Sequence, residues 1–448
     1  MQTFDLIVFY ATVFFIAVLG GSSRYDLVQV VVLQPLLWIC LAIAVLRMHH
    51  IRDFEIPVLL AVVYGLWLSL QLIPLPFAIW SQLAGREPIA AVDLQLIGET
   101  WRPLSLTPSR TLNALAYLPA LLAPMIAAIN LGRRLPFHVV SAILAIAVMS
   151  GLIGLVQILT GSLYFYSVTI IGRAVGLFAN PNHTAVFGSI AMVIAGAAAL
   201  VKPKGILRSL LVATAVLLLF TTITNGSRAG LATLMLAIAA LLVCVWFSLD
   251  GGSAKRARRG LSHTGWRIIG IGAATVTIGA IAMLFIMSDR IPALQSLAEE
   301  DPLSDSRFRI FPVLVDMVRT YFPWGIGVGA FEESYYISEP AELLKPNYLN
   351  MAHNDIIQVV IEGGIIGVGF IVAILFAIAR AFKNSIRLLG RRTVASLAIG
   401  IIGVGAIVFA GSAFDYPLRT PIFQATLAML FVLIYAASHQ RNDHETMD

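Results

Sequence analysis

The chain has 448 residues, of which 59% are hydrophobic and only 12% are charged, and its formal net charge is +6. Soluble domains carry about 25% charged residues, so this composition excludes an ordinary soluble enzyme and indicates an integral membrane protein. The two cysteines, Cys40 and Cys244, both fall inside apolar runs, which excludes a secreted domain held together by disulfides.

Twelve apolar runs follow one another along the chain, each close to the roughly twenty residues that cross a bilayer. They lie approximately at 4–20, 27–46, 56–73, 111–130, 137–159, 182–201, 206–224, 229–249, 267–287, 356–379, 394–412 and 421–437. Lipid offers the backbone no hydrogen-bond partner, so each run is predicted to be a helix. We therefore expect an all-α integral membrane protein of about 12 transmembrane helices, built as a single polytopic domain over 1–448.

The basic residues predict the orientation of these spans. If the N-terminus is cytoplasmic, the cytoplasmic segments hold 18 of the 30 Lys and Arg residues. Both ends are then cytoplasmic, including a short tail at 436–448, and a large polar loop at 288–355 faces outward. The positive net charge follows from this topology and does not indicate a nucleic-acid partner. The first run has no basic segment before it and no obvious cleavage site, which favours an uncleaved signal-anchor.

The remaining basic residues face outward, and arginine strongly outnumbers lysine among them. They are Arg24, Arg86, Arg102, Arg110, Arg173, Arg228, Arg290, Arg307, Arg309, Arg319, Lys345 and Arg419. Guanidinium groups bind phosphate oxygens in a bidentate manner and stay charged when partly desolvated. The bias therefore indicates a diphosphate-bearing ligand, although small numbers and contacts with membrane lipid headgroups explain it equally well.

Two short segments open the sixth and eighth spans at the outer face. In the first, which runs from Arg173 to His183, Asn180-Pro181-Asn182 is typical of a turn and a helix cap. His183 serves either in packing or in the site. In the second, Gly226-Ser227-Arg228 puts an arginine beside the free N–H groups of a helix start, which favours an anion. Headgroup anchoring is an equally good interpretation of Arg228.

The outer loop contains an acidic patch and then a predicted helix. Glu299-Glu300-Asp301 lacks the convergent spacing of metal ligands, and the chain contains no Asp-x-Asp, so we expect neither a metal nor another cofactor. The predicted helix carries one apolar stripe, formed by Phe308, Phe311, Val315, Val318 and Phe322. A short amphipathic helix on the membrane surface fits this pattern and would hold Arg307 and Arg309 at headgroup height.

A glycine-rich segment follows the predicted helix. Gly325, Gly327 and Gly329 alternate with apolar residues. Such a segment is suited to a tight turn, and it can also present backbone N–H groups to a phosphate. The turn is the better supported of the two interpretations.

His353-Asn354-Asp355 ends the loop and opens the tenth apolar run. Asn354 or Asp355 would cap the helix, but capping gives no reason for His353, which is a candidate general base. Gln358 and Glu362 lie on the same helical face as Asp355 at spacings of three and four. A carboxylate inside a span costs about 2.5–3.5 kcal/mol on insertion scales, so Glu362 should face the helix bundle and have a partner. Three glycines, Gly363, Gly364 and Gly367, then allow close helix packing.

These motifs together resemble the O-antigen ligase and polymerase superfamily of bacterial membrane glycosyltransferases. His353-Asn354 with Glu362-Gly363-Gly364-Ile365-Ile366-Gly367 resembles its His-Asn…Glu-x-Gly-x-x-Gly signature. The segment Gly176–His183 resembles its Gly-x-Phe-x-Asn-Pro-Asn motif, Ser227-Arg228 its Ser-Arg, and Phe414-Asp415-Tyr416-Pro417 a recurring C-terminal turn. The matches keep the order of the family over roughly 170–421, and the first 110 residues contribute topology only.

The resemblance implies a GT-C-like, metal-independent, inverting transferase in the bacterial inner membrane, with a periplasmic active site. Its donor would be an oligosaccharide on undecaprenyl diphosphate, and its acceptor either another lipid-linked glycan or lipid A-core. His353 would orient or deprotonate the acceptor hydroxyl. Arg228 and Arg307, with Arg309 or Arg173 as second candidates, would neutralise the leaving diphosphate. Asn354, Asp355, Glu362, Asn182 and His183 would support the site.

Two choices stay open. The segments Asn180–His183 and Asp415–Pro417 resemble exopolysaccharide polymerases slightly more than lipopolysaccharide ligases, which favours a polymerase. The alternative from another class is a transporter of a lipid-linked glycan or small anion, in which Glu362 would be a coupling carboxylate. No repeated halves or matching broken spans support a transporter.

Overall fold

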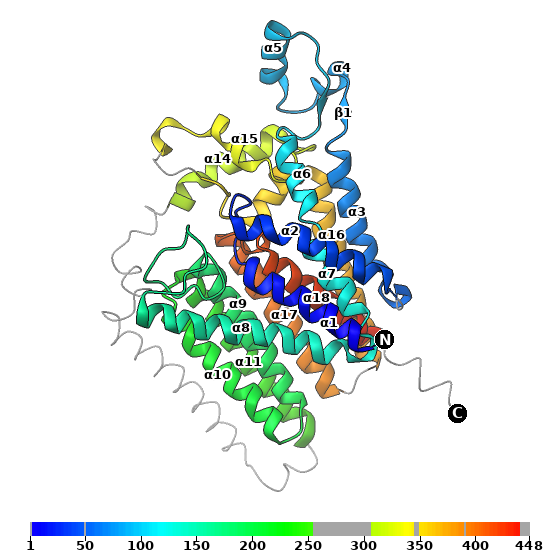
Figure 1. The fold of residues 1–448 in the computed structure, drawn as a ribbon, viewed down its shortest axis with the longest axis vertical. Helices are drawn as coiled ribbons and strands as arrows, with labels where there is room; N and C mark the ends of the chain where they lie inside the picture. Colours follow the sequence, from blue (N-terminus) through cyan, green and yellow to red (C-terminus); the bar gives the residue numbers. More distant parts are fainter. Residues whose placement is uncertain (1, 49–50, 254–305, 345–348, 389–390, 440–448) are drawn as a thin grey trace. The chain divides into compact units, whose positions relative to one another are not determined.

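The computed structural model describes residues 2–48, 51–253, 306–344, 349–388 and 391–439. Within them the chain is almost entirely helical, with one pair of two-residue strands (Figure 1). Nine of the described helices are long and apolar enough to cross a membrane, and Thr3–Leu19 and Glu55–Leu70 are shorter apolar helices. The predicted fold class, an all-α integral membrane protein, is confirmed.

Eleven of the twelve predicted runs coincide with helices in the described residues. They are α1 Gln2–Leu19, α2 Val28–Leu46, α3 Glu55–Leu70, α6 Pro108–Ala116 with α7 Pro119–Ile129, α8 Leu135–Thr160, α9 Pro181–Val201, α10 Ile206–Thr224, α11 Arg228–Ser253, α16 Asp355–Leu388, α17 Arg391–Phe414 and α18 Pro421–His439. The run at 267–287, the acidic patch at 299–301 and the end of the tail lie outside the described residues. The fourth run is interrupted by a turn at Tyr117 and Leu118, just before Pro119, which has no amide N–H to donate to the preceding helical turn.

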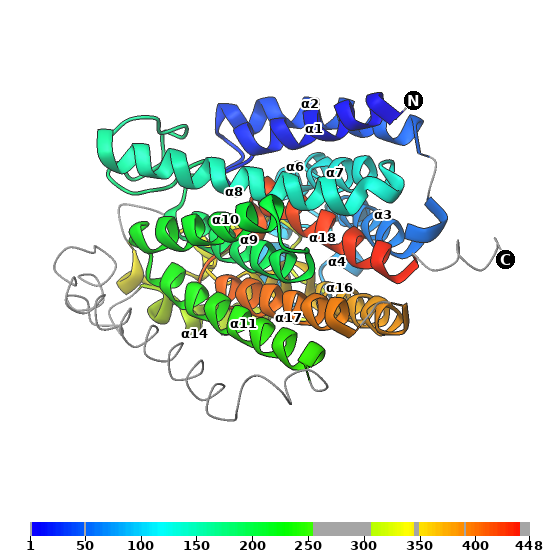
Figure 2. The same cartoon turned by 90° about the horizontal axis from the view of Figure 1, so that it is seen from below.

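The chain forms two compact units, of which the first comprises 1–139, 303–384 and 412–448. Its centre is a group of four helices in which α7 packs against α1, α2 and α18 (Figures 1 and 2). Helix α16 contacts α18 of this group and also α3. The Tyr435 hydroxyl of α18 donates to the Ala377 carbonyl at 3.4 Å, and the rings of Tyr64 on α3 and Phe370 lie 5.4 Å apart.

The second unit comprises 140–302 and 385–411. Its helix α9 packs along both α10 and α11. Small residues set these close approaches, as expected between spans that gain no hydrophobic stabilisation from leaving lipid. A Cβ at Gly188 of α9 would lie 2.7 Å from the Thr222 hydroxyl of α10, and one at Gly230 of α11 would overlap Ala185 of α9.

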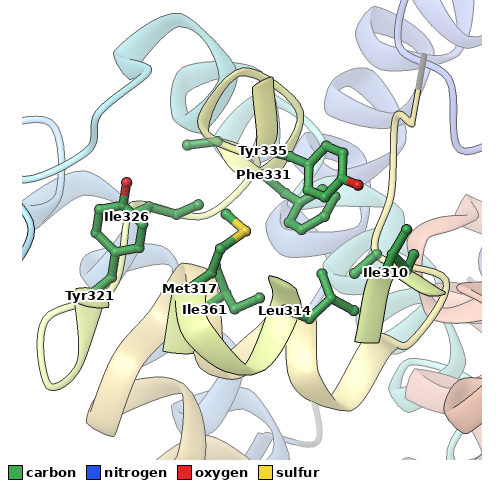
Figure 3. Close-up of a cluster of buried hydrophobic side chains, with 10 residues drawn as sticks. Ile310, Leu314, Met317, Tyr321, Ile326, Phe331, Tyr335 and Ile361 are labelled. Atoms are coloured by element: carbon green, nitrogen blue, oxygen red, sulfur yellow. The ribbon is translucent and has the colours of Figure 1, made fainter. Parts of the chain in front are cut away.

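Helix α14, Ser306–Tyr321, confirms the helix predicted in the outer loop but not the face that packs. Its buried face is formed by Ile310, Leu314, Met317 and Tyr321, which join α15 (Phe331–Ser338) and Ile361 in one apolar cluster (Figure 3). The predicted stripe lies on the adjacent face, where Phe311 and Phe322 stay 48% and 44% exposed. The sequence pattern could not distinguish the two stripes, because both repeat at helical spacing.

An ordered hairpin-like extension, missing from the sequence predictions, connects α3 to α6. Strand β1 (Pro74–Leu75) pairs with β2 (Arg102–Pro103), and the short helices α4 (Phe77–Trp80) and α5 (Glu87–Leu96) lie between them. Arg86 holds this extension in place from a fully buried position. Its guanidinium donates to the carbonyls of Ala84, Leu104 and Gly325 at 3.0, 2.8 and 2.7 Å. Burial lowers the pKa of Arg86 to about 10.

The glycine-rich segment is a structural strap between this extension and α16. Four successive backbone amides of this segment donate hydrogen bonds within the chain. Gly325 donates to the Tyr321 carbonyl, and Val328 donates to the Gln71 side chain. Ile326 and Gly327 donate to the carbonyls of Ile361 and Glu362, respectively. These amides do not point at a phosphate. The turn interpretation is therefore correct, and the phosphate-loop alternative is wrong for this segment.

Helix α16 can receive the strap because it is broken at Gly364, whose φ of 54° and ψ of −141° are not helical. The break leaves the Ile361 and Glu362 carbonyls free for the strap, and the Ile365 amide donates instead to the Pro323 carbonyl at 2.8 Å. Gly364 therefore serves backbone geometry and not the helix packing predicted from the sequence. Only glycine adopts this conformation readily.

Gly364→Ala is expected to destabilise the protein by roughly 2–4 kcal/mol, because the backbone conformation suits only glycine and the new Cβ would overlap the Pro323 carbonyl oxygen. Thermal unfolding in detergent measures the effect. Gly363→Ala is the matched control, since a Cβ at Gly363 would meet no atom within 4 Å. Equal unfolding midpoints for the two variants would contradict the role given to Gly364.

Candidate functional site

His353 is held at the start of α16 in an unusual backbone conformation. Its φ is 49°, and His353 and Leu163 are the two non-glycine residues with positive φ in the described part of the chain. Such strain persists only where the surrounding structure enforces it, and it concentrates at functional sites. Asn354 is the helix cap, because its side-chain oxygen accepts the Ile357 amide at 3.0 Å. The cap therefore fixes the neighbouring His353 without using the imidazole.

The imidazole of His353 is paired with a carboxylate from another part of the chain. His353 Nδ1 lies 3.2 Å from Asp415 Oδ1, and Asp415 is only 1% exposed. An ionised carboxylate only accepts, so this contact suits the tautomer of the neutral imidazole that has its proton on Nδ1 and its lone pair on Nε2. The His353 side chain is 24% exposed, and the Tyr416 ring packs edge-on against it at 4.9 Å. This is the arrangement of an oriented general base.

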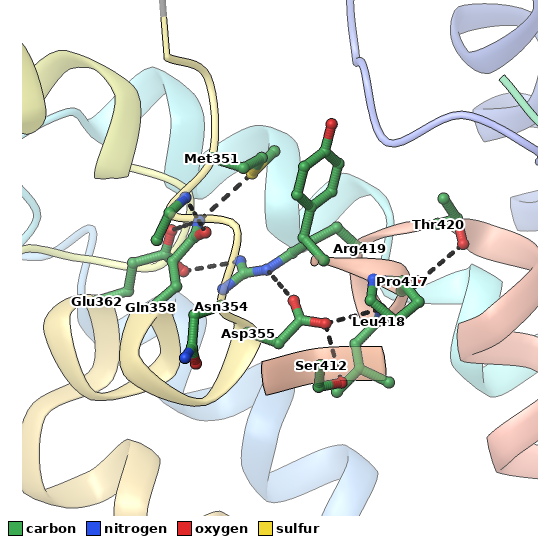
Figure 4. Close-up of polar contacts among 12 residues, drawn as sticks. Met351, Asn354, Asp355, Gln358, Glu362, Ser412, Pro417, Leu418, Arg419 and Thr420 are labelled. Carbon is green, nitrogen blue, oxygen red and sulfur yellow. Dashed lines mark hydrogen bonds and ion pairs between the residues drawn. The ribbon is translucent and has the colours of Figure 1, made fainter. Parts of the chain in front are cut away.

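The turn that carries Asp415 also places one arginine between two buried carboxylates of α16 (Figure 4). Arg419 Nη1 donates to Glu362 Oε2 at 2.8 Å, and its Nε lies 3.5 Å from Asp355 Oδ1. Gln358 completes the group by donating to Glu362 Oε1 at 2.9 Å. Burial alone would lower the pKa of Arg419, but Glu362 and Asp355 raise it above its ordinary value. The prediction that Glu362 faces inward with a partner is confirmed.

Asp355 does not cap α16, although capping was one interpretation of it. Its Oδ2 accepts the Leu418 amide at 3.0 Å and the Ser412 hydroxyl at 3.2 Å. The Asn354 side chain adds a bond to the Ala413 carbonyl at 3.1 Å. These contacts bind the turn between α17 and α18 to the start of α16, and that turn carries both Asp415 and Arg419.

Most of the arginines that were predicted to face outward have partners within the chain. Arg24 pairs with Asp26, Arg102 with Asp93, Arg110 with Glu332 and Glu333, Arg319 with Asp316, and Arg419 with Asp355 and Glu362. Arg86 binds carbonyls, as described above. The bias towards arginine is therefore explained in large part by structural ion pairs, and it does not by itself indicate a diphosphate site.

The second unit brings together the two predicted segments that open α9 and α11. Arg173 Nη1 donates to the Gly226 carbonyl at 2.8 Å, and the Ser227 hydroxyl donates to the Asn182 side chain at 2.7 Å. Asn180 caps α9 by accepting the Asn182 amide at 2.9 Å, as predicted.

Arg228 is the first residue of α11 and is half-buried. Arg173 and Asn182 therefore lie in one cluster beside the helix that Arg228 opens. His183 is 1% exposed in the first turn of α9, which favours its packing interpretation.

The remaining predicted arginines lie on α14. Arg309 is exposed, and its guanidinium donates to the Glu342 carbonyl at 3.3 Å. The side chain of Arg307 lies outside the described part of the structure. The His353 group belongs to the first unit, and Arg173 and Arg228 belong to the second. Their convergence on one site stays a prediction.

Comparison with known families adds to this geometry. Residues 213–372 match the family model Wzy_C, described as O-antigen ligase. This part of the chain is similar to the O-antigen ligase domain. No curated protein matches the chain. The domain supports the O-antigen ligase/polymerase superfamily recognised from the motifs, and it includes Arg228, Arg309 and His353.

The match over residues 213–372 supports an enzyme of the O-antigen ligase/polymerase type. Members of this family are glycosyltransferase-like enzymes of surface polysaccharide assembly. The family implies lipid-linked glycan substrates and a membrane environment. The match ends before Asp415 and Arg419, which the sequence predictions did not include as site residues. A signal for Asp415 existed in the Phe414–Pro417 turn, but no local pattern connects that turn with His353.

Proposed function

We propose that the protein transfers a glycan from undecaprenyl diphosphate to an acceptor hydroxyl at the periplasmic face of the bacterial inner membrane. The observation that carries this proposal is the His353–Asp415 pair, a partly exposed imidazole beside a buried carboxylate, in a chain that matches the O-antigen ligase family over residues 213–372. The distribution of basic residues supports the periplasmic location, since it puts the loop before His353 outside.

The proposed reaction is a single inverting displacement. Nε2 of His353 accepts the proton of the acceptor hydroxyl as its oxygen bonds to the anomeric carbon. The bond between that carbon and the diphosphate oxygen breaks on the opposite face, and the lipid diphosphate leaves with the electron pair. Arg228 and Arg307, with Arg309 or Arg173, neutralise the charge that accumulates on this leaving group. No metal takes part, as the family resemblance implies.

Polymerase action is the preferred form, with ligation to lipid A-core as the alternative. The preference comes from the likeness of Asn180–His183 and Asp415–Pro417 to exopolysaccharide polymerase motifs. Transport is disfavoured because Glu362, its candidate coupling carboxylate, is engaged on both oxygens by Gln358 and Arg419.

Purified protein supplied with lipid-linked repeat units and no lipid A-core tests the polymerase form. A ladder of glycan lengths on a gel is the expected result, because each lipid-linked repeat can then act as both donor and acceptor. His353→Asn serves as the inactive control. Absence of a ladder, followed by product formation once lipid A-core is added, would establish the ligase instead.

A further inference from the structure

We propose that Arg419 is a positioning residue for glycan transfer: it holds the α17–α18 turn against the start of α16 and so keeps Asp415 within reach of His353. The inference rests on the proposed function, because it concerns how the general base of that reaction is oriented. Arg419 thereby brings together two parts of the chain that are distant in sequence.

The catalytic pair is assembled across a sequence separation of 62 residues. His353 precedes α16, whereas Asp415 lies in the turn that ends α17. A single contact of 3.2 Å joins the two side chains, and it provides little resistance to a shift of the turn. Their alignment therefore depends on what fixes the turn to the helix.

Arg419 adds the charged part of that attachment, because it is four residues after Asp415 and contacts two turns of α16. Asp355 and Glu362 are 1% exposed and lie seven residues apart on one helical face. The guanidinium can meet both at once, since its donors are spread over a planar fork. The Leu418 amide and the Ser412 hydroxyl, both bound to Asp355, then hold the turn on either side of Asp415.

Charge makes this attachment specific to arginine. Two buried carboxylates face one guanidinium, and removal of the cation leaves both without compensation, which is strongly unfavourable in a buried site. The turn is then expected to move until the carboxylates find water or protons, and Asp415 moves with it. A lysine retains the charge but has a single ammonium, so it can serve Glu362 or Asp355 and not the two in the same geometry.

A double-mutant cycle in the purified full-length protein tests the inference. Arg419→Lys is expected to lower kcat for glycan transfer roughly 10–100-fold with KM for the lipid-linked donor unchanged, because a displacement of about 1 Å at a reacting group costs on the order of 100-fold. In the His353→Asn background the same change should have no further effect on kcat, because Arg419 acts through His353. Arg319→Lys, an exposed arginine paired with Asp316, is the matched control and should retain full activity.

Three results would overturn the inference. These are a kcat unaffected by Arg419→Lys, a loss that appears in KM alone, and an Arg419→Lys loss that repeats in full in the His353→Asn background. Arg419→Gln, combined with Glu362→Gln to remove the matching charge, gives a second cycle if the lysine variant is poorly folded. Failure of the proposed function has a different signature, since His353→Asn by itself would then retain activity.

Discussion

Replacement of His353 by asparagine is expected to lower the rate of glycan transfer by about 10²–10⁴-fold, the range typical of losing a positioned general base. The reason is chemical and not structural. Asparagine tolerates the left-handed backbone found at His353 and can still bond to Asp415, but it cannot accept a proton at neutral pH. The measurement is the initial rate with purified protein and a lipid-linked donor.

Folding of the His353→Asn variant provides the control. Its yield in the membrane fraction and its unfolding midpoint in detergent should equal those of the wild type, because the imidazole is 24% exposed and caps nothing. Full activity in a well-folded His353→Asn protein would remove the general-base mechanism. A loss of both activity and membrane insertion would point to a structural role for the side chain.

Asp415→Asn is expected to reduce kcat by on the order of 100-fold or more, with a much smaller effect on KM. An asparagine at this position can donate its amide to Nδ1 of His353, which would leave the proton on Nε2 and block that nitrogen as a base. The variant keeps the size of the side chain, but an amide nitrogen in place of Oδ1 gives up the bond that Oδ1 accepts from the Tyr416 amide at 3.0 Å. Steady-state kinetics over a range of donor concentrations separates kcat from KM.

Asp316→Asn is the matched control for Asp415, because Asp316 is an exposed carboxylate paired with an exposed arginine and exposed pairs contribute little to stability. Wild-type kinetics are expected for it. A normal kcat in Asp415→Asn would show that the carboxylate does not orient the base, even though it lies beside the imidazole.

Most of the fold could be predicted from the sequence because the bilayer imposes a strong and local constraint. A run of about twenty apolar residues must form a helix, and its ends are visible in the hydropathy. Hydropathy does not predict a break in a helix where no proline is present. Gly364 interrupts α16 inside an uninterrupted apolar run, and its role depends on a strap that comes from residues 323–328.

The sequence predicted only those residues of the candidate site that lie close together along the chain. His353, Asn354 and Glu362 could be recognised because they occur together at helical spacing beside a polar loop. Asp415 and Arg419 could not, because their contacts with that group span more than fifty residues and one short turn offers no periodic signal. The prediction of which face of α14 is buried was wrong for a related reason. Two adjacent apolar stripes have the same helical spacing in the sequence, and only the structure shows which one is buried.

The arginines show how composition can mislead. An excess of arginine at the outer face is compatible with a diphosphate ligand, yet several of these residues bind carboxylates or carbonyls of the chain itself. Arg173 donates a hydrogen bond to the Gly226 carbonyl, which lies just before α11 and two residues before Arg228. The diphosphate role proposed for Arg228 and Arg307 therefore rests on the family motif and not on the count of arginines.

The most direct test of glycosyl transfer is to quantify released undecaprenyl diphosphate and new glycosidic bonds in the same reaction, with purified protein in detergent micelles. Micelles have no compartments, so transport cannot contribute to either quantity. One lipid diphosphate per new bond is expected for the wild type, and both products should fall together in His353→Asn. Neither bond formation nor diphosphate release in micelles, with intact lipid-linked glycan crossing the bilayer of vesicles containing the same protein, would contradict a glycosyltransferase and establish a transporter.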